Sequence, residues 1–202
     1  SCGGGGKRAD RLYNRSQRNH VDERGHHMER ICGRVNVKLG DHIDTDMISS
    51  NQFSKGKGYG PKDWAECCLR VVDRDFPEKM AAGGGGILVV GVNFGCGSSR
   101  ESAPTSIQIC GAKAIIGEEF ARIFYRSAIN LGLVCIEAPG ITASADVGDQ
   151  LEVDPATGII YNRTKDLTIQ GSPIPANLVQ QFEAGGLMPY LQDKLGIRKK
   201  ED

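Results

Sequence analysis

The sequence lacks several features that would assign it to a common class of protein. It has no C-x-x-C pair and no G-x-x-x-x-G-K-[ST] loop, and its 25 basic residues balance its 25 acidic residues. Its longest apolar run, residues 87–92, is far too short to span a bilayer. These absences argue against a zinc site, a P-loop nucleotide site, a nucleic-acid-binding role and a membrane protein.

The cysteines also lack a recognisable pattern. There are seven of them, an odd number with irregular spacing, and none combines with one of the four histidines in a metal-ligand pattern. We therefore expect mostly buried, reduced thiols and no metal bound by this chain. With no secretory signal evident, the composition favours a cytoplasmic protein.

Residues 1–30 have the composition of a disordered tail. They hold seven basic and four acidic residues, the glycine run Gly3–Gly6 and almost no apolar positions, so they could not bury a face. Two interpretations are open. The segment is either a vector junction, with Met28 as the native start, or a remnant of an arginine-rich transit peptide, which would place the protein in an organelle matrix or stroma. The folded domain is expected to span residues 31–202.

From Ile31 onward, strand-like and helix-like segments alternate. The first strand should place Ile31, Gly33, Val35 and Val37 on one face. Further strands are expected at 87–92, 114–117, 133–137, 150–153, 159–162 and 167–170, and helices at 61–70, 101–110, 119–130, 177–183 and 187–195. This order predicts an α/β fold with a mixed central sheet flanked by helices. Ligands of such sheets bind at the carboxyl ends of the strands.

The segment Gly91–Pro104, GVNFGCGSSRESAP, carries the clearest chemical signal and follows a strand that is apolar on both faces. Its three glycines let the backbone turn sharply and approach a ligand closely. Ser98, Ser99 and Arg100 then bring two hydroxyls and a guanidinium together, and a guanidinium binds carboxylates with two parallel hydrogen bonds. The pattern favours a site for a small carboxylate.

A structural interpretation of the same segment is also open. Ser98 and Glu101 fit a capping box, in which Ser98 would only cap a helix. Pro104, however, is compatible with a regular helix only in its first turn. The helix is therefore expected to begin near Glu101, which leaves the Ser98 hydroxyl free, whereas a kinked helix would restore the capping role.

Three segments together resemble a known family. Asp44–Asp46, residues 91–101, and Ala121–Arg126 followed by Asn130 and Gly132 are similar to the small subunit of 3-isopropylmalate dehydratase. That family is related to the swivelling domain of aconitase. The resemblance covers about residues 31–195 and implies a swivelling β/β/α domain of the aconitase type.

The resemblance also implies an activity that this chain would share with a partner. The family isomerises 2-isopropylmalate and 3-isopropylmalate by dehydration and rehydration in leucine biosynthesis, and a small subunit is active only with a large subunit. The large subunit carries the [4Fe-4S] cluster, so no cofactor is expected on this chain. The implied partners are this large subunit and a small hydroxy-carboxylate substrate.

The family's motif further implies roles for three consecutive residues. Ser98 matches the serine that acts as the base and removes a proton α to a carboxylate. Ser99 and Arg100 match residues that bind the substrate carboxylate and stabilise that base. A positioned guanidinium and nearby backbone N–H groups are the devices that favour an alkoxide. Without the motif, Arg100 would be interpreted as a surface or ion-pairing arginine.

Asp46 matches a family acid near the active site, where it would bind or orient basic groups. An aspartate that only stabilises a turn is an open alternative for this position. Four further residues of the glycine-rich segment are expected to shape the loop: Asn93, Gly95, Cys96 and Gly97.

Two departures from the family pattern affect the substrate. The family has histidine after the Arg-Glu pair, whereas this chain has Ser102. The segment Met47–Gly60 also differs from the leucine-pathway form, and its Lys55 and Lys57 either meet a third carboxylate or are solvated. A homoaconitate or a methyl-substituted malate is therefore an alternative substrate. A carboxylate-binding regulatory protein without catalysis is the alternative from another class.

Overall fold

The computed structural model describes residues 28–50 and 60–197. Its centre is a seven-stranded sheet in the order β4-β3-β2-β1-β5-β6-β7. The first four strands are parallel neighbours and the last three continue the sheet in antiparallel pairs. Their bounds are β1 Ile31–Lys38, β2 Gly86–Val90, β3 Ala112–Gly117, β4 Val134–Glu137, β5 Gln150–Asp154, β6 Ile159–Asn162 and β7 Leu167–Gln170.

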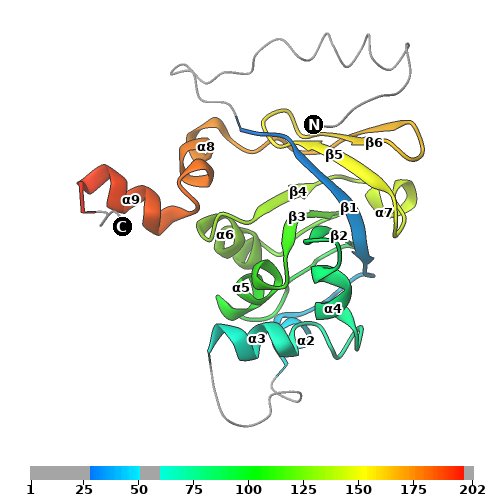
Figure 1. The fold of residues 1–202 in the computed structure, drawn as a ribbon, viewed down its shortest axis with the longest axis horizontal. Helices are drawn as coiled ribbons and strands as arrows, with labels where there is room; N and C mark the ends of the chain where they lie inside the picture. The colour runs from blue at the N-terminus through cyan, green and yellow to red at the C-terminus, as the bar shows by residue number, and fades with distance from the viewer. Residues whose placement is uncertain (1–27, 51–59, 198–202) are drawn as a thin grey trace.

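The helices are α2 Thr45–Ile48, α3 Pro61–Cys67, α4 Phe76–Ala81, α5 Ser102–Ile109, α6 Arg122–Asn130, α7 Ile141–Ser144, α8 Ala176–Glu183 and α9 Leu187–Leu195. Helices α2 to α6 cover one side of the parallel strands, and the antiparallel strands lie on the other side, where α7 and α8 pack with them (Figure 1). The result is three layers, helices on a parallel sheet and that sheet on an antiparallel one. The predicted mixed α/β fold and its β/β/α layering are confirmed.

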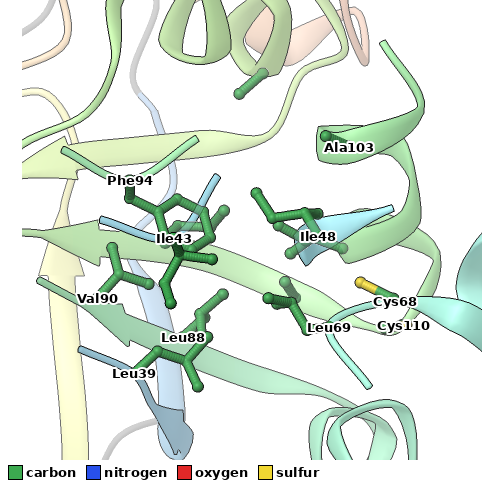
Figure 2. Packing of buried hydrophobic residues seen from close by; sticks show 14 of the residues in the cluster. Leu39, Ile43, Ile48, Cys68, Leu69, Leu88, Val90, Phe94, Ala103 and Cys110 are labelled. Carbon is green, nitrogen blue, oxygen red and sulfur yellow. The ribbon is translucent and has the colours of Figure 1, made fainter. Parts of the chain in front are cut away.

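Strand β2 separates two hydrophobic cores. Leu88 and Val90 point into the core shared with the helices, where Figure 2 shows them together with Phe94. Ile87 and Val89 point into the core shared with the antiparallel strands. Because side chains alternate along a strand and both faces are covered, every residue of β2 is buried. This explains the apolar run without polar alternation.

A bulge in β1 corrects one detail of the sequence-based prediction. Val35 pairs with Ile87, but Val37 pairs with Leu88, so Asn36 is an extra residue between them. Val35 and Val37 consequently enter different cores and do not share one face. The Asn36 amide donates hydrogen bonds to three carbonyls at the end of α4, those of Lys79, Met80 and Ala82.

The packed domain begins slightly before the predicted start. Met28 is buried in the core beside the antiparallel strands, and Arg30 forms an ion pair with Glu152 at 2.9 Å. Residues 28–30 therefore do not belong to a tail. Residues 1–27 lie outside the described residues, so the proposed tail stays a prediction.

The predicted strands and long helices all occur, with ends that shift by a few residues. Three short helices, α2, α4 and α7, were not predicted. Each has four to six residues, too few to show a helical period in the sequence.

Candidate active site

The glycine-rich loop leaves the carboxyl end of β2 and is held by two other segments. On one side, the Gly95 N–H donates to the Ile43 carbonyl at 2.7 Å, and the Thr45 N–H donates to the Cys96 carbonyl at 2.8 Å. These bonds align the loop with the segment that leads from β1 into α2. They bring the acidic motif Asp44–Asp46 and the loop that contains Ser98 side by side.

On its other side, the loop contacts the segment before α6. The Phe94 N–H donates to the Glu119 carbonyl at 3.1 Å, and the Ala121 N–H donates to the Phe94 carbonyl at 2.9 Å. The Phe94 and Phe124 rings meet edge to face with their centroids 5.2 Å apart. The third motif of the sequence therefore supports the loop through backbone pairing and aromatic packing.

Gly95 makes this close packing possible. Its φ is +80°, and a Cβ at this position would lie 2.2 Å from Cγ of Phe124. A side chain here would be strained by the backbone conformation and would overlap a buried ring. Gly97, with φ +107°, allows a similar approach to the Thr45 hydroxyl, which would lie 3.1 Å from its Cβ. Asn93 also adopts a positive φ, of 57°. These conformations agree with the predicted loop-shaping role.

Ser98 lies against Thr45. The Ser98 N–H donates to Oγ1 of Thr45 at 3.1 Å, and the two side-chain oxygens are 3.0 Å apart. Thr45 is only 2% exposed and is the first residue of α2. Asp44 caps this helix, because its carboxylate accepts a hydrogen bond from the Met47 N–H. The short helix thus fixes the threonine hydroxyl beside the serine, which is half-buried.

Ser98 does not cap the helix that follows. Helix α5 begins at Ser102, and Pro104 is its third residue, in the first turn. The predicted start of the helix near Glu101 is confirmed, whereas the Ser98 hydroxyl, which was expected to be free, contacts Oγ1 of Thr45. Ser98 and Ser99 lie in the loop, and Ser99 is exposed.

Arg100 and Asp46 form an ion pair through Nη1 and Oδ1. Their side chains are 50% and 72% exposed, so water screens this pair and its contribution to stability is small. The pairing uses one end of the guanidinium. The Nε and Nη2 donors of Arg100 have no partner among the described residues and remain available for a carboxylate.

A cavity of about 360 Å³ adjoins this ion pair. Arg100 and Asp46 line it, together with the apolar side chains of Met47 and Val71. Ser49 also lines it, and its hydroxyl is the one buried side-chain polar atom without a hydrogen-bond partner in the described part of the chain. Ser98 and Ser99 are not among the described lining residues, so both serines lie beside the cavity and not within it.

The structure brings the predicted residues together and adds others. Ser98, Arg100 and Asp46 come from two segments that the sequence separates by about fifty residues, as predicted from the motifs. The roles of Thr45, Ser49 and Val71 were missed. Thr45 lies within the Asp44–Asp46 motif, and this motif was the signal available in the sequence. No pattern near Val71 indicates that it belongs to the site. Lys55 and Lys57 lie outside the described residues.

The thiols near the site do not suggest a nucleophile. Cys68 and Cys110 are buried with free thiols, and burial raises the pKa of the Cys68 thiol. Cys96, in the loop itself, is free and partly exposed. Within residues 28–50 and 60–197, no group of three or more His, Cys, Asp or Glu residues is arranged to hold a metal ion. No helix in the same ranges is long and apolar enough to cross a membrane.

Comparison with known proteins decides the family. The family model of the aconitase C-terminal domain matches residues 16–140. The chain belongs to this family. One similar protein is the isopropylmalate/citramalate isomerase small subunit of Methanocaldococcus jannaschii, which is 44% identical over 165 residues, or 82% of this chain and 95% of the relative.

Two further proteins are similar to this chain over most of their length. The 2,3-dimethylmalate dehydratase small subunit of Eubacterium barkeri is 42% identical over 154 residues, which is 76% of this chain and 92% of the relative. The crystal structure of 3-isopropylmalate dehydratase from Methanocaldococcus jannaschii superposes with a TM-score of 0.73. It is 38% identical, covering 84% of this chain and 97% of that one.

Proposed function

We propose that this chain is the small subunit of a hydro-lyase that isomerises 2-isopropylmalate and 3-isopropylmalate by dehydration and rehydration in leucine biosynthesis. The observation that carries the proposal is the contact of the Ser98 hydroxyl with Thr45, next to a guanidinium with free donors. The relatives named as subunits of such enzymes support the proposal, because the similarity to this chain extends over nearly the whole length of each relative.

In this proposal, Ser98 is the base. Its oxygen takes the proton from the carbon α to a substrate carboxylate and returns it during rehydration. A serine hydroxyl is a poor base in water, so the negative oxygen needs donors. Oγ1 of Thr45 already accepts the Ser98 N–H, which leaves its own proton free to donate to Oγ of Ser98. Donation to a negatively charged oxygen is about twice as strong as a neutral hydrogen bond.

Arg100 binds a substrate carboxylate in the proposed mechanism. Asp46 holds one Nη1 donor and so fixes the direction of the guanidinium. The opposite edge, Nε with Nη2, matches the two oxygens of a carboxylate. Ser99, exposed on the same loop, adds a hydroxyl donor to that carboxylate. Arg100 and Ser99 therefore orient the substrate, and Ser98 transfers the proton.

The cavity suits a substrate with both charged and apolar parts. Arg100 lies at one part of its lining, while Met47 and Val71 provide apolar surface for a branched alkyl group. A hydroxydicarboxylate with an aliphatic side group combines these requirements.

The large subunit would supply the [4Fe-4S] cluster, which would provide Lewis-acid chemistry for the removal of the substrate hydroxyl. The residues of this chain bind and orient the carboxylate and move the proton.

The test is an assay of the reconstituted complex. The chain is mixed with a cluster-loaded large subunit from the same source, and the unsaturated intermediate is followed by absorbance with 3-isopropylmalate as substrate. We expect turnover with the wild type and its loss in Ser98→Ala, with complex formation unchanged. Turnover that Ser98→Ala leaves intact would overturn the assignment of the base.

A second substrate class is favoured by the relatives themselves. The match named for both isopropylmalate and citramalate is 44% identical, and the match named for 2,3-dimethylmalate is 42% identical, so overall identity does not separate these substrates. Citramalate and 2,3-dimethylmalate are therefore assayed in parallel. Turnover of one of them without turnover of 3-isopropylmalate would keep the hydro-lyase and change its substrate. Binding of malates without turnover of any would favour a carboxylate-binding regulatory protein.

A further inference from the structure

A second and larger cavity lies at the opposite end of the parallel strands. Its volume is about 570 Å³, and residues at the start of β1 and of β3 line it together with Gly85, just before β2. The glycine-rich loop begins after the other end of β2. Five strand residues, each rising about 3.3 Å, therefore separate the two sites by about 16 Å.

The lining of this cavity is positively charged. Arg34, Lys79 and Lys113 line it, and no aspartate or glutamate occurs among its described lining residues. Lys79 is neutralised by Asp73, whose carboxylate lies 2.7 Å from Nζ. Arg34 and Lys113 have no acidic partner in the ranges that the structure describes. Two uncompensated cations thus face one hollow.

Two bulges direct side chains into the same hollow. Gly86 pairs with Ala112 and Ile87 with Ala114, which makes Lys113 the extra residue of β3. Asn36 is the corresponding extra residue of β1, and it also lines the cavity. Bulges re-aim side chains and are common near functional sites. Here they lie on both sides of the start of β2.

The floor of the cavity is open backbone. Gly83 and Gly85 line it and have φ values of +68° and +88°. A Cβ at Gly83 would meet no atom within 4 Å, whereas one at Gly85 would lie 2.2 Å from the Gly111 carbonyl oxygen, so there is room next to the backbone at Gly83 and close packing at Gly85. A ligand can approach this turn closely.

We propose that this cavity is a binding site for a small oxyanion with at least two negative charges, either a phosphate or a polycarboxylate, separate from the Ser98 site. Arg34 grips one anionic group through its planar fork, and Lys113 neutralises a second as a point charge. The ligand shares its chemistry with the proposed substrates, but the site contains no group placed to move a proton. The proposal is for binding only.

The test is a titration of the full chain, labelled with ¹⁵N, with sodium citrate and with inorganic phosphate. Sodium chloride keeps the ionic strength constant, and backbone amide shifts report the position of binding. We expect saturable shifts at Gly83, Gly85 and Lys113 with at least one of the two anions. Citrate alone would identify a carboxylate site, and phosphate alone a phosphate site.

Variants distinguish this cavity from general attraction to a basic surface. Arg34→Gln and Lys113→Gln should each weaken binding about tenfold, the loss expected for one charge-assisted contact. Arg74→Gln removes an exposed arginine outside the cavity and should leave the affinity unchanged. Absence of saturable shifts with both anions, or shifts that Arg34→Gln and Lys113→Gln leave unaltered, would overturn the proposal.

Discussion

Oγ1 of Thr45 lies 3.0 Å from Oγ of Ser98 and accepts the Ser98 N–H at 3.1 Å. This double contact joins residues 53 positions apart in the chain. It depends on α2, a helix of four residues, and on Gly97, whose missing side chain admits the threonine hydroxyl. The serine is therefore oriented by a group that belongs to another segment of the chain.

The contact predicts a catalytic effect for Thr45→Val. The substitution removes the hydroxyl but retains its volume, so the serine oxygen loses a donor when it becomes negative. A hydrogen bond to a charged group contributes about 1.5–3 kcal/mol, and kcat of the reconstituted complex should fall about 10-fold to 100-fold.

Thr45→Ser is the matched control, because it retains the hydroxyl and loses only a methyl group. We expect Thr45→Ser to retain most of the activity. Complex formation with the large subunit, measured by gel filtration, should be unchanged in both variants. A Thr45→Val complex with wild-type kcat would show that the threonine hydroxyl does not assist the base.

The ion pair of Arg100 with Asp46 leads to a second prediction. The pair is exposed, so Arg100→Lys should change the free energy of unfolding by less than about 1 kcal/mol. Lysine cannot form the two parallel bonds of the guanidinium, and KM for the hydroxydicarboxylate should rise about tenfold or more. Steady-state kinetics and thermal unfolding of the same preparation check both parts.

Asp46→Asn separates orientation of the guanidinium from its charge. The substitution keeps the shape of the side chain but weakens its bond to Arg100, so a smaller rise in KM is expected than for Arg100→Lys. If Asp46 only stabilised the turn, Asp46→Asn would lower the melting temperature without changing KM.

Much of the fold could be predicted because its signals are local. The apolar run of β2 indicated burial on both faces, and Pro104 located the start of α5 through its missing N–H. The position of the loop at the carboxyl end of β2 followed from the order of the elements. Ser98 and Arg100 were identified from the loop and from the family resemblance.

The remaining features depend on contacts between distant segments. Nothing near Val71 in the sequence indicates that it lines the cavity, since only the path of the chain after α3 brings it there. The bulge at Asn36 was also missed, because its cause is the side chain bonding to the end of α4 and not a pattern within β1. Such features require the tertiary structure.

Asp146 leads to a prediction about acid stability. Lys165 and Lys38 bond its carboxylate at 2.6 Å and 2.8 Å and lower its pKa from the ordinary value of 3.8 to about 2. Because the folded-state pKa is the lower one, the contribution to stability is complete above about pH 4. It is lost as the pH falls from about 4 to about 2. Carboxyl ¹³C shifts should report the low pKa directly.

Lys165→Gln tests the cause of this shift. It removes one of the two cations, so the pKa of Asp146 should move up toward 3.8, and the loss of stability between about pH 4 and pH 2 should become smaller. Asp146→Asn should flatten the pH dependence of unfolding within the same window. An Asp146 pKa near 3.8 in the wild type would contradict both expectations.

The final prediction compares two glycines with nearly the same backbone conformation. Gly95 has φ +80° and Gly84 has φ +82°, so alanine is strained at both positions by the same left-handed geometry. That strain costs about 1–2 kcal/mol. At Gly84 the new Cβ would meet no atom within 4 Å, so Gly84→Ala should lower the free energy of unfolding by about this amount only.

At Gly95 the same substitution has a further effect, because the new Cβ would lie 2.2 Å from Cγ of Phe124. The buried ring cannot move without disturbing its contact with Phe94, and overpacking in a core adds about 1–3 kcal/mol. Gly95→Ala should therefore be clearly less stable than Gly84→Ala in urea denaturation. It should also lose activity in the reconstituted complex, because the loop that carries Ser98 must shift, whereas Gly84→Ala should retain it. Equal stability of the two variants would mean that the loop can move away from Phe124, and the position of Ser98 would then not depend on that packing.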